Sequence, residues 1–240
     1  NWLFPNRAYE LLNNAVMTER FRFDPGKRVD LRAALELTDE SFAVLQIGTF
    51  NAQKNQAFLI GAFARMLKQN PCASLLLVGD GENKASCESL ACRLGVADRV
   101  RFLGWREDIP ALLSAADVFA LPSLHEGLPL TLVEAQCAGL PCLVSSSVTK
   151  EAALTPLVVS FSIEDEQAFA GALCSLTAMD RAAASDSAIL RLQAAGYDVS
   201  GNAASTSSTE VKAMRVAPGR SSWPQKRARG ETRRRRRRSD

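Results

Sequence analysis

Six short apolar runs divide the chain, and each is followed by polar residues. They cover residues 42–47, 75–78, 99–103, 117–121, 142–144 and 157–161. Short runs without polar alternation are typical of strands that are buried on both faces of a parallel sheet. The pattern therefore predicts a parallel sheet of about six strands.

Helical patterns lie between these runs. We expect helices over residues 29–37, 55–68, 82–94, 109–115, 129–138, 164–177 and 181–198, and a short helical piece near the start of the chain. Pro129 suits the first turn of a helix, and Gly95 and Gly139 suit helix ends. Strands that alternate with helices predict an α/β fold, with helices on both faces of the parallel sheet.

The stretch PSLHEGLPLTLVEAQCAGLPCLVSS at residues 122–146 carries the strongest candidate chemistry. If the eight steps from Glu126 to Glu134 were all helical, the two residues would lie ~12 Å apart along the axis. That is too far for two carboxylates acting on one bond, which sit roughly 5–9.5 Å apart in glycosidases. It suits two ends of an elongated ligand. Backbone N–H groups near Gly127, Leu128 and Leu130, at the positive end of the helix, suit a phosphate.

A ligand with hydroxyl groups at both ends and a phosphate between them is a nucleotide-sugar. The alternative is that both glutamates are solvated charges at helix ends.

The segment HEGLPLTLVEAQCAGLPCLVS resembles the Glu-x7-Glu signature of retaining glycosyltransferases of the family-4 type, especially those that build capsular and exopolysaccharides. The resemblance implies one half of a GT-B fold, the Rossmann-like donor-binding half. It also implies that Glu134 holds the ribose, Glu126 the donor sugar, and loop amides the diphosphate. The expected donor is linked to UDP or GDP, and the resemblance implies no metal and no other cofactor.

Two glycine-containing loops precede this stretch. GTFNAQKN, from Gly48 to Asn55, follows the first strand and resembles the family's "GR-x-x-x-QKN", in which an arginine and a lysine neutralise the diphosphate. Lys54 matches the lysine, but Thr49 stands where the arginine would be. The alternative for Lys54 is a solvated lysine at a helix start. VGDGE, which contains Gly79 and Gly81, resembles a family segment that faces the donor cleft.

Three further residues are candidates for the nucleotide and sugar. Trp105 and Arg106 follow the third strand, where the family's loop lies beside the base. The alternative for Trp105 is packing beneath the next helix. His125, the only histidine, lies beside Glu126 and is expected to line the site rather than to act as a base.

Three segments are expected. Residues 1–22 resemble the end of an N-terminal domain and its hinge, with Ala15 and Met17 in place of the family's glycine and aspartate. Residues 23–199 form the nucleotide-sugar domain, which closes with AGYD. Residues 200–240 are rich in Ser, Gly and Arg, which predicts a disordered tail.

Charge and composition refine this picture. The net charge of +3 combines +9 in residues 205–240 with −6 in residues 1–204, so the expected folded part is acidic. No apolar run approaches the ~18 residues of a transmembrane helix. The chain opens at Asn1 without a signal-peptide pattern. The six cysteines lack C-x-x-C spacing, which favours buried free thiols over a zinc or redox site.

The function that follows is transfer of a sugar, with retention of configuration, to a polysaccharide or lipid-linked acceptor. Lys54 and Glu126 are the candidate catalytic residues. A cytoplasmic location is expected, with peripheral association with the inner face of the membrane. Two alternatives remain, an inactive nucleotide-sugar binding fragment and a protein that binds nucleic acid through its Arg-rich tail.

Overall fold

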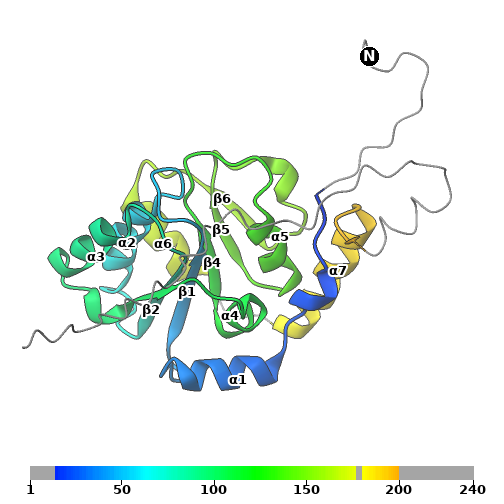
Figure 1. Cartoon of the computed structure of the whole chain (residues 1–240), viewed down its shortest axis with the longest axis horizontal. Coiled ribbons are helices and arrows are strands. Elements are labelled where there is room, and N and C mark those ends of the chain that lie inside the picture. The colour runs from blue at the N-terminus through cyan, green and yellow to red at the C-terminus, as the bar shows by residue number, and fades with distance from the viewer. Residues whose placement is uncertain (1–13, 177–179, 200–240) are drawn as a thin grey trace, which may run out of the picture.

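Six parallel strands form one sheet in the computed structural model, which describes residues 14–176 and 180–199 (Figure 1). The strands are β1 (Phe42–Ile47), β2 (Ala73–Val78), β3 (Val100–Gly104), β4 (Val118–Leu121), β5 (Cys142–Ser145) and β6 (Val158–Phe161). Their order across the sheet is β3-β2-β1-β4-β5-β6, and every pairing is parallel. The predicted α/β, Rossmann-like fold and its six strands are confirmed.

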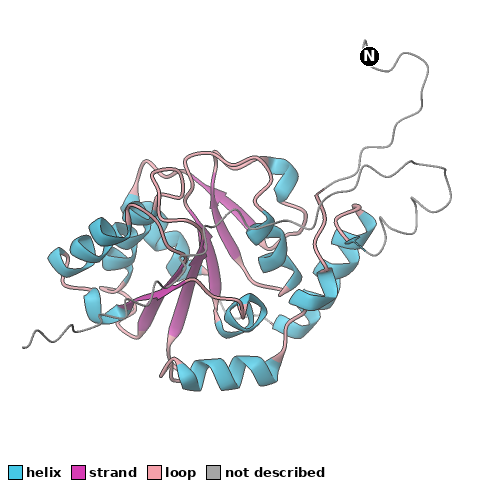
Figure 2. Cartoon of the chain, in the orientation of Figure 1, coloured by secondary structure: helices cyan, strands magenta, loops and turns pink. Residues whose placement is uncertain are grey.

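Helices cover both faces of the sheet, as Figure 2 shows. One face carries α1 (Pro25–Ala34), α4 (Ile109–Ala115), α5 (Leu130–Cys137) and α7 (Arg181–Ala194), and the other carries α2 (Gln56–Met66), α3 (Lys84–Arg93) and α6 (Glu166–Ser175). Successive strand residues point to opposite faces. Leu45 therefore belongs to the core beneath the first set of helices and Val44 to the core beneath the second.

Some helix ends differ from the prediction because polar caps set them. α1 begins at Pro25 rather than at residue 29, since the Asp24 side chain accepts a hydrogen bond from the N–H of Lys27. α6 begins at Glu166, because Asp165 caps the N–H groups of Gln167 and Ala168. The helical pattern within residues 1–13 and the predicted tail at 200–240 lie outside the described residues.

The described part of the predicted hinge packs against the end of the chain. Val16 forms a bridge with Asp198, and the buried Thr18 donates to Asp198 Oδ1 from its backbone nitrogen at 3.1 Å and from Oγ1 at 2.7 Å. The short 3-10 helix Thr18–Phe21 contacts α5 and α7. Residues 14–22 and the AGYD segment thus form one unit on the α5 side of the sheet.

The strand order reverses between β1 and β4. From β1 the chain moves outward through β2 and β3, and from β4 it moves outward in the other direction through β5 and β6. Loops that leave the carboxyl ends of two such neighbouring strands diverge and leave a crevice, where open α/β sheets bind ligands. Lys54 follows β1 and Glu126 follows β4. The topology therefore brings the two predicted loops to one place.

We predict that Gly139→Ala destabilises the fold more than Gly95→Ala does. Both glycines follow a helix with left-handed backbone, at φ +61° and +70°. An added Cβ at Gly139 would lie 2.5 Å from the backbone nitrogen of Ser185 in α7, whereas at Gly95 it would meet nothing within 4 Å. The left-handed conformation costs ~1–2 kcal/mol in both variants, and the clash adds ~1–3 kcal/mol at Gly139 alone. Urea unfolding measures the difference, and equal losses would contradict the rigid contact between α5 and α7.

Candidate functional site

Lys54 and Glu126 meet in an ion pair across the point where the strand order reverses. Lys54 Nζ lies 2.6 Å from Glu126 Oε1, and the two side chains are only 18% and 9% exposed. The solvated alternative for each residue is therefore wrong. The Coulomb attraction in such a sheltered pair is stronger than at the surface, because water screens it less, although removing both charges from water offsets part of the gain.

Three contacts hold Lys54 in this position. Gln46, buried in β1, donates its Nε2 to the carbonyl oxygen of Lys54 at 2.7 Å. Asn51 Oδ1 accepts the backbone N–H of Lys54 at 2.9 Å. A Cβ added to Gly48 would lie 3.1 Å from Cδ and Cε of Lys54, so the glycine leaves the space through which the lysine stem passes.

The loop that carries Glu126 is joined to the Lys54 loop. Leu124 donates its backbone N–H to the carbonyl oxygen of Gln53 at 2.8 Å, and Gln53 Nε2 donates to the carbonyl oxygen of His125 at 3.0 Å. On its other side, Glu126 forms a parallel bridge with Val148. Glu126 is therefore fixed from both sides, while the side chain of His125 is exposed.

Positions 79 and 81 require glycine, because the backbone of the loop after β1 lies too close for a side chain there. An added Cβ at Gly79 would lie 2.1 Å from the carbonyl oxygen of Gly48, and one at Gly81 would lie 2.4 Å from that of Phe50. Both glycines have positive φ. The loop after β2 therefore lies directly against the loop after β1, next to Lys54.

Trp105 and Arg106 differ in their surroundings. Trp105 is 60% exposed, so the alternative in which it packs beneath the next helix is wrong. Arg106 forms two hydrogen bonds with Asp108, at 2.7 and 2.5 Å, and this contact lowers the pKa of the Asp108 carboxyl. Of the two, Trp105 alone presents a free surface beside the loops, because Arg106 is already paired.

α5 begins at the end of the loop that carries Glu126. Pro129 precedes its first residue, and no side chain caps the helix. Gly127 and Leu130 are exposed, while Leu128 is half-buried against the core. Uncapped N–H groups at a helix start favour an anion.

Glu134 lies on the second turn of α5 and is largely buried. Burial raises the pKa of its carboxyl to about 7, and the positive charge of nearby Arg20 acts in the opposite direction. A carboxylate that is kept out of water is poised to accept hydrogen bonds from a ligand that replaces the lost solvent.

Thr49 brings no positive charge to the site. Its carbonyl oxygen accepts a hydrogen bond from Gln56 Nε2 at 2.9 Å. In the part of the chain that the structure describes, Lys54 is the one cation that forms an ion pair with a predicted site carboxylate.

Sequence reasoning missed the positioning role of Gln46 and the buried Gln56. A glutamine inside the apolar run at residues 42–47 was the available signal, since buried polar side chains need partners.

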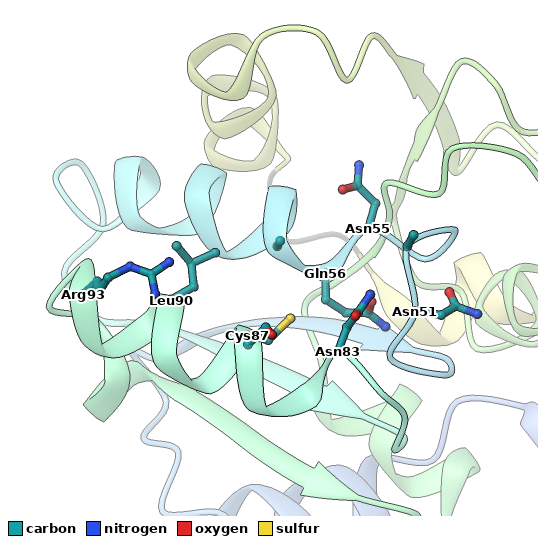
Figure 3. Close-up of a pocket in the computed structure, with 10 residues that line it drawn as sticks. Asn51, Asn55, Gln56, Asn83, Cys87, Leu90 and Arg93 are labelled. Atoms are coloured by element: carbon teal, nitrogen blue, oxygen red, sulfur yellow. The ribbon is translucent and has the colours of Figure 1, made fainter.

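A cavity of about 300 Å³ lies between α2 and α3 (Figure 3). Its lining residues are Asn51, Ala52, Asn55, Gln56, Ala57, Asn83, Ser86, Cys87, Leu90 and Arg93. None of the predicted site residues is among them. The turn that carries Lys54 borders this cavity, because Asn51, Ala52 and Asn55 belong to both.

Cys87, Cys137 and Cys142 are buried free thiols, but Cys72 and Cys92 are exposed, because each lies on the outer side of its turn or helix. Residues 14–176 and 180–199 contain no group of three or more His, Cys, Asp or Glu side chains arranged to hold a metal ion. Within the same ranges, no helix has the length and apolar character needed to cross a membrane.

Comparison with known proteins gives one consistent result. Residues 41–179 match the family described as "Glycosyl transferases group 1". A galactosyltransferase of Escherichia coli, named for UDP-Gal and GlcNAc-diphosphoundecaprenol, is 37% identical over 139 residues, which are 57% of this chain and 36% of that protein. The putative glycosyltransferase EpsF of Bacillus subtilis is 36% identical over 141 residues, which are 59% of this chain and 37% of that protein.

Solved structures agree. Anabaena Alr3699/HepE, crystallised with UDP-glucose, has a TM-score of 0.70 and 26% identity, covering 83% of this chain and 57% of that one. The matched part of this chain spans little more than a third of the length of the two curated relatives.

We predict that Glu134 makes stability depend on pH. Because its pKa is about 7 in the folded protein and 4.5 in the reference state, the folded state holds a proton that the unfolded chain releases. Stability is full below pH 4.5 and falls as pH rises through 7. Glu134→Gln should therefore be more stable than the wild type at pH 8, by up to ~3 kcal/mol, and equal to it at pH 4. Urea unfolding at both pH values is the measurement, and a constant difference would contradict the raised pKa.

Proposed function

The chain belongs to the group 1 glycosyl transferases, since the family match spans residues 41–179, and we propose that it binds a nucleoside-diphosphate sugar. The complete protein would transfer that sugar, with retention of configuration, to a glycan or lipid-linked acceptor. The observation that carries the proposal is the meeting of Lys54 and Glu126 at the reversal of strand order.

Each residue has a role that suits its position. Lys54 and the uncapped start of α5 would hold the diphosphate and stabilise the charge that develops as it departs. Glu126 would accept hydrogen bonds from the sugar hydroxyls. Glu134, further along α5, would accept those of the ribose. Trp105 would offer its exposed ring to the base.

The relatives support a uridine or guanosine donor. UDP is named for the E. coli galactosyltransferase and for the HepE complexes, and GDP-mannose is named for a mannosyltransferase of Mycobacterium tuberculosis that is 33% identical over 152 residues. We propose that Lys54 and backbone amides serve the diphosphate without a metal ion. The lipid-linked acceptor named for the E. coli relative supports an acceptor at a membrane surface and peripheral association with it.

One observation favours a second function, binding of the nucleotide-sugar without transfer. Thr49 stands where the resembled family has its second cation, so the departing diphosphate has less positive charge beside it. Loss of one such stabilising group costs on the order of 2.7–4 kcal/mol of activation free energy. Hydrolysis or transfer of bound donor, followed in the same samples as binding, separates the two functions.

We predict that Glu134→Gln weakens nucleotide binding by ~10–100-fold, because hydrogen bonds to a charged acceptor contribute ~1.5–3 kcal/mol. Calorimetric titrations with UDP, GDP and their sugar conjugates measure the effect at pH 8, where Glu134 is ionised. Glu88→Gln, at an exposed position of α3, is the matched control and should bind like the wild type. If the folded wild type binds none of these nucleotides, the proposal is wrong.

A further inference from the structure

The Lys54–Glu126 ion pair joins two groups that the proposed function assigns to different parts of the donor. Lys54 is assigned to the diphosphate and Glu126 to the sugar, yet in the structure each neutralises the other at 2.6 Å. Among the described residues, neither side chain forms a second ion pair. A donor phosphate at Lys54 therefore competes with the carboxylate of Glu126 for the same ammonium group.

We propose that Glu126 acts as an internal competitor of the donor diphosphate, so that the site favours the intact nucleotide-sugar over the nucleoside diphosphate left after transfer. This inference rests on the proposed function. An intact donor supplies a phosphate to Lys54 and hydroxyl groups to Glu126. A nucleoside diphosphate supplies the phosphate alone and leaves Glu126 without its partner.

Burial makes this difference matter. Leaving one member of a sheltered ion pair unpaired is costly, because the remaining charge has lost both its partner and most of its water. Glu126 is the more enclosed of the two side chains, at 9% exposure against 18% for Lys54. The free-energy cost of leaving Glu126 unpaired therefore weakens the complex with a nucleoside diphosphate, which has no sugar to contact it.

The local charge balance strengthens the effect. Thr49 is neutral, and the guanidinium of Arg106 is occupied by Asp108. Neither residue therefore offers a free positive charge to a phosphate that enters beside Lys54, next to the carboxylate of Glu126. The two anions repel each other unless hydroxyl groups of a sugar satisfy the carboxylate.

The pair is also built into the fold. Gln46 and Asn51 fix the backbone of Lys54, and Gly48 leaves room for its stem. The Gln53 contacts and the bridge to Val148 fix the loop of Glu126. Since both ends are held, the ion pair is a defined starting state that the donor exchanges for its own contacts.

The test compares Glu126→Gln with the wild type. Glutamine keeps the size of the side chain but removes its charge, so Lys54 is released. We expect the variant to bind UDP or GDP, whichever the wild type binds, roughly five-fold more tightly or better, while its preference for the sugar conjugate over the bare diphosphate falls by a similar factor. The matching nucleoside, which lacks phosphates, should bind both proteins equally. Lys54→Gln should weaken the diphosphate and its sugar conjugate alike.

The outcomes separate the two proposals. If the wild type binds nucleotides and Glu134→Gln weakens this binding as predicted, but Glu126→Gln leaves diphosphate affinity unchanged or lower, the competition is wrong and the proposed function stands. If the folded wild type binds no nucleotide, both are wrong. Should Glu126→Gln fail a thermal-unfolding check, Glu126→Ala replaces it. Alanine removes the carboxylate altogether, and the same increase in diphosphate affinity is required of it.

Discussion

The reversal of strand order between β1 and β4 is the constraint on which the site depends. Because all six strands are parallel, their carboxyl ends share one edge of the sheet, and at the reversal the two following loops must part. The fold places Lys54 on one loop and Glu126 on the other, and then joins the loops through Gln53. Gly79 and Gly81 allow the next loop to close against the same region.

The two edges of the sheet use buried charge differently. At the amino edge, Asp117 receives hydrogen bonds from Arg28, Arg32 and the backbone of Ala43, which fixes α1 to the sheet. Arg181 at the start of α7 donates to three backbone carbonyl oxygens, and burial lowers its pKa to about 10. These groups find all their partners within the protein, so they stabilise the fold.

At the carboxyl edge the buried charges are less completely satisfied. Lys54 and Glu126 have one another, and the positive charge of Arg20 only partly offsets the burial of Glu134. A ligand that brings phosphate and hydroxyl groups supplies what these side chains lack. The free energy of keeping Glu134 out of water would then contribute to recognition, so the predicted pH dependence of stability and the proposed nucleotide binding depend on the same residue.

The sequence by itself determined the α/β class, the six strands and the glycines at helix ends, because near-continuous apolar runs and local backbone preferences act over a few residues. It also indicated Glu126, Glu134 and Lys54 through their motifs. The sequence did not predict helix starts that a side-chain cap sets. The predicted start of α1, residue 29, was wrong, because Asp24 caps a helix that begins at Pro25.

Only the tertiary structure decided which residues contact one another in the site. Lys54 and Glu126 are 72 positions apart, and no periodicity relates them. Their contact arises because two separate strands become neighbours at the reversal. Packing between elements also decides three other properties of the site. It buries Glu134 and so raises the pKa of that carboxyl, it leaves Trp105 exposed, and it lets Gln46 anchor Lys54. None of these follows from order along the chain.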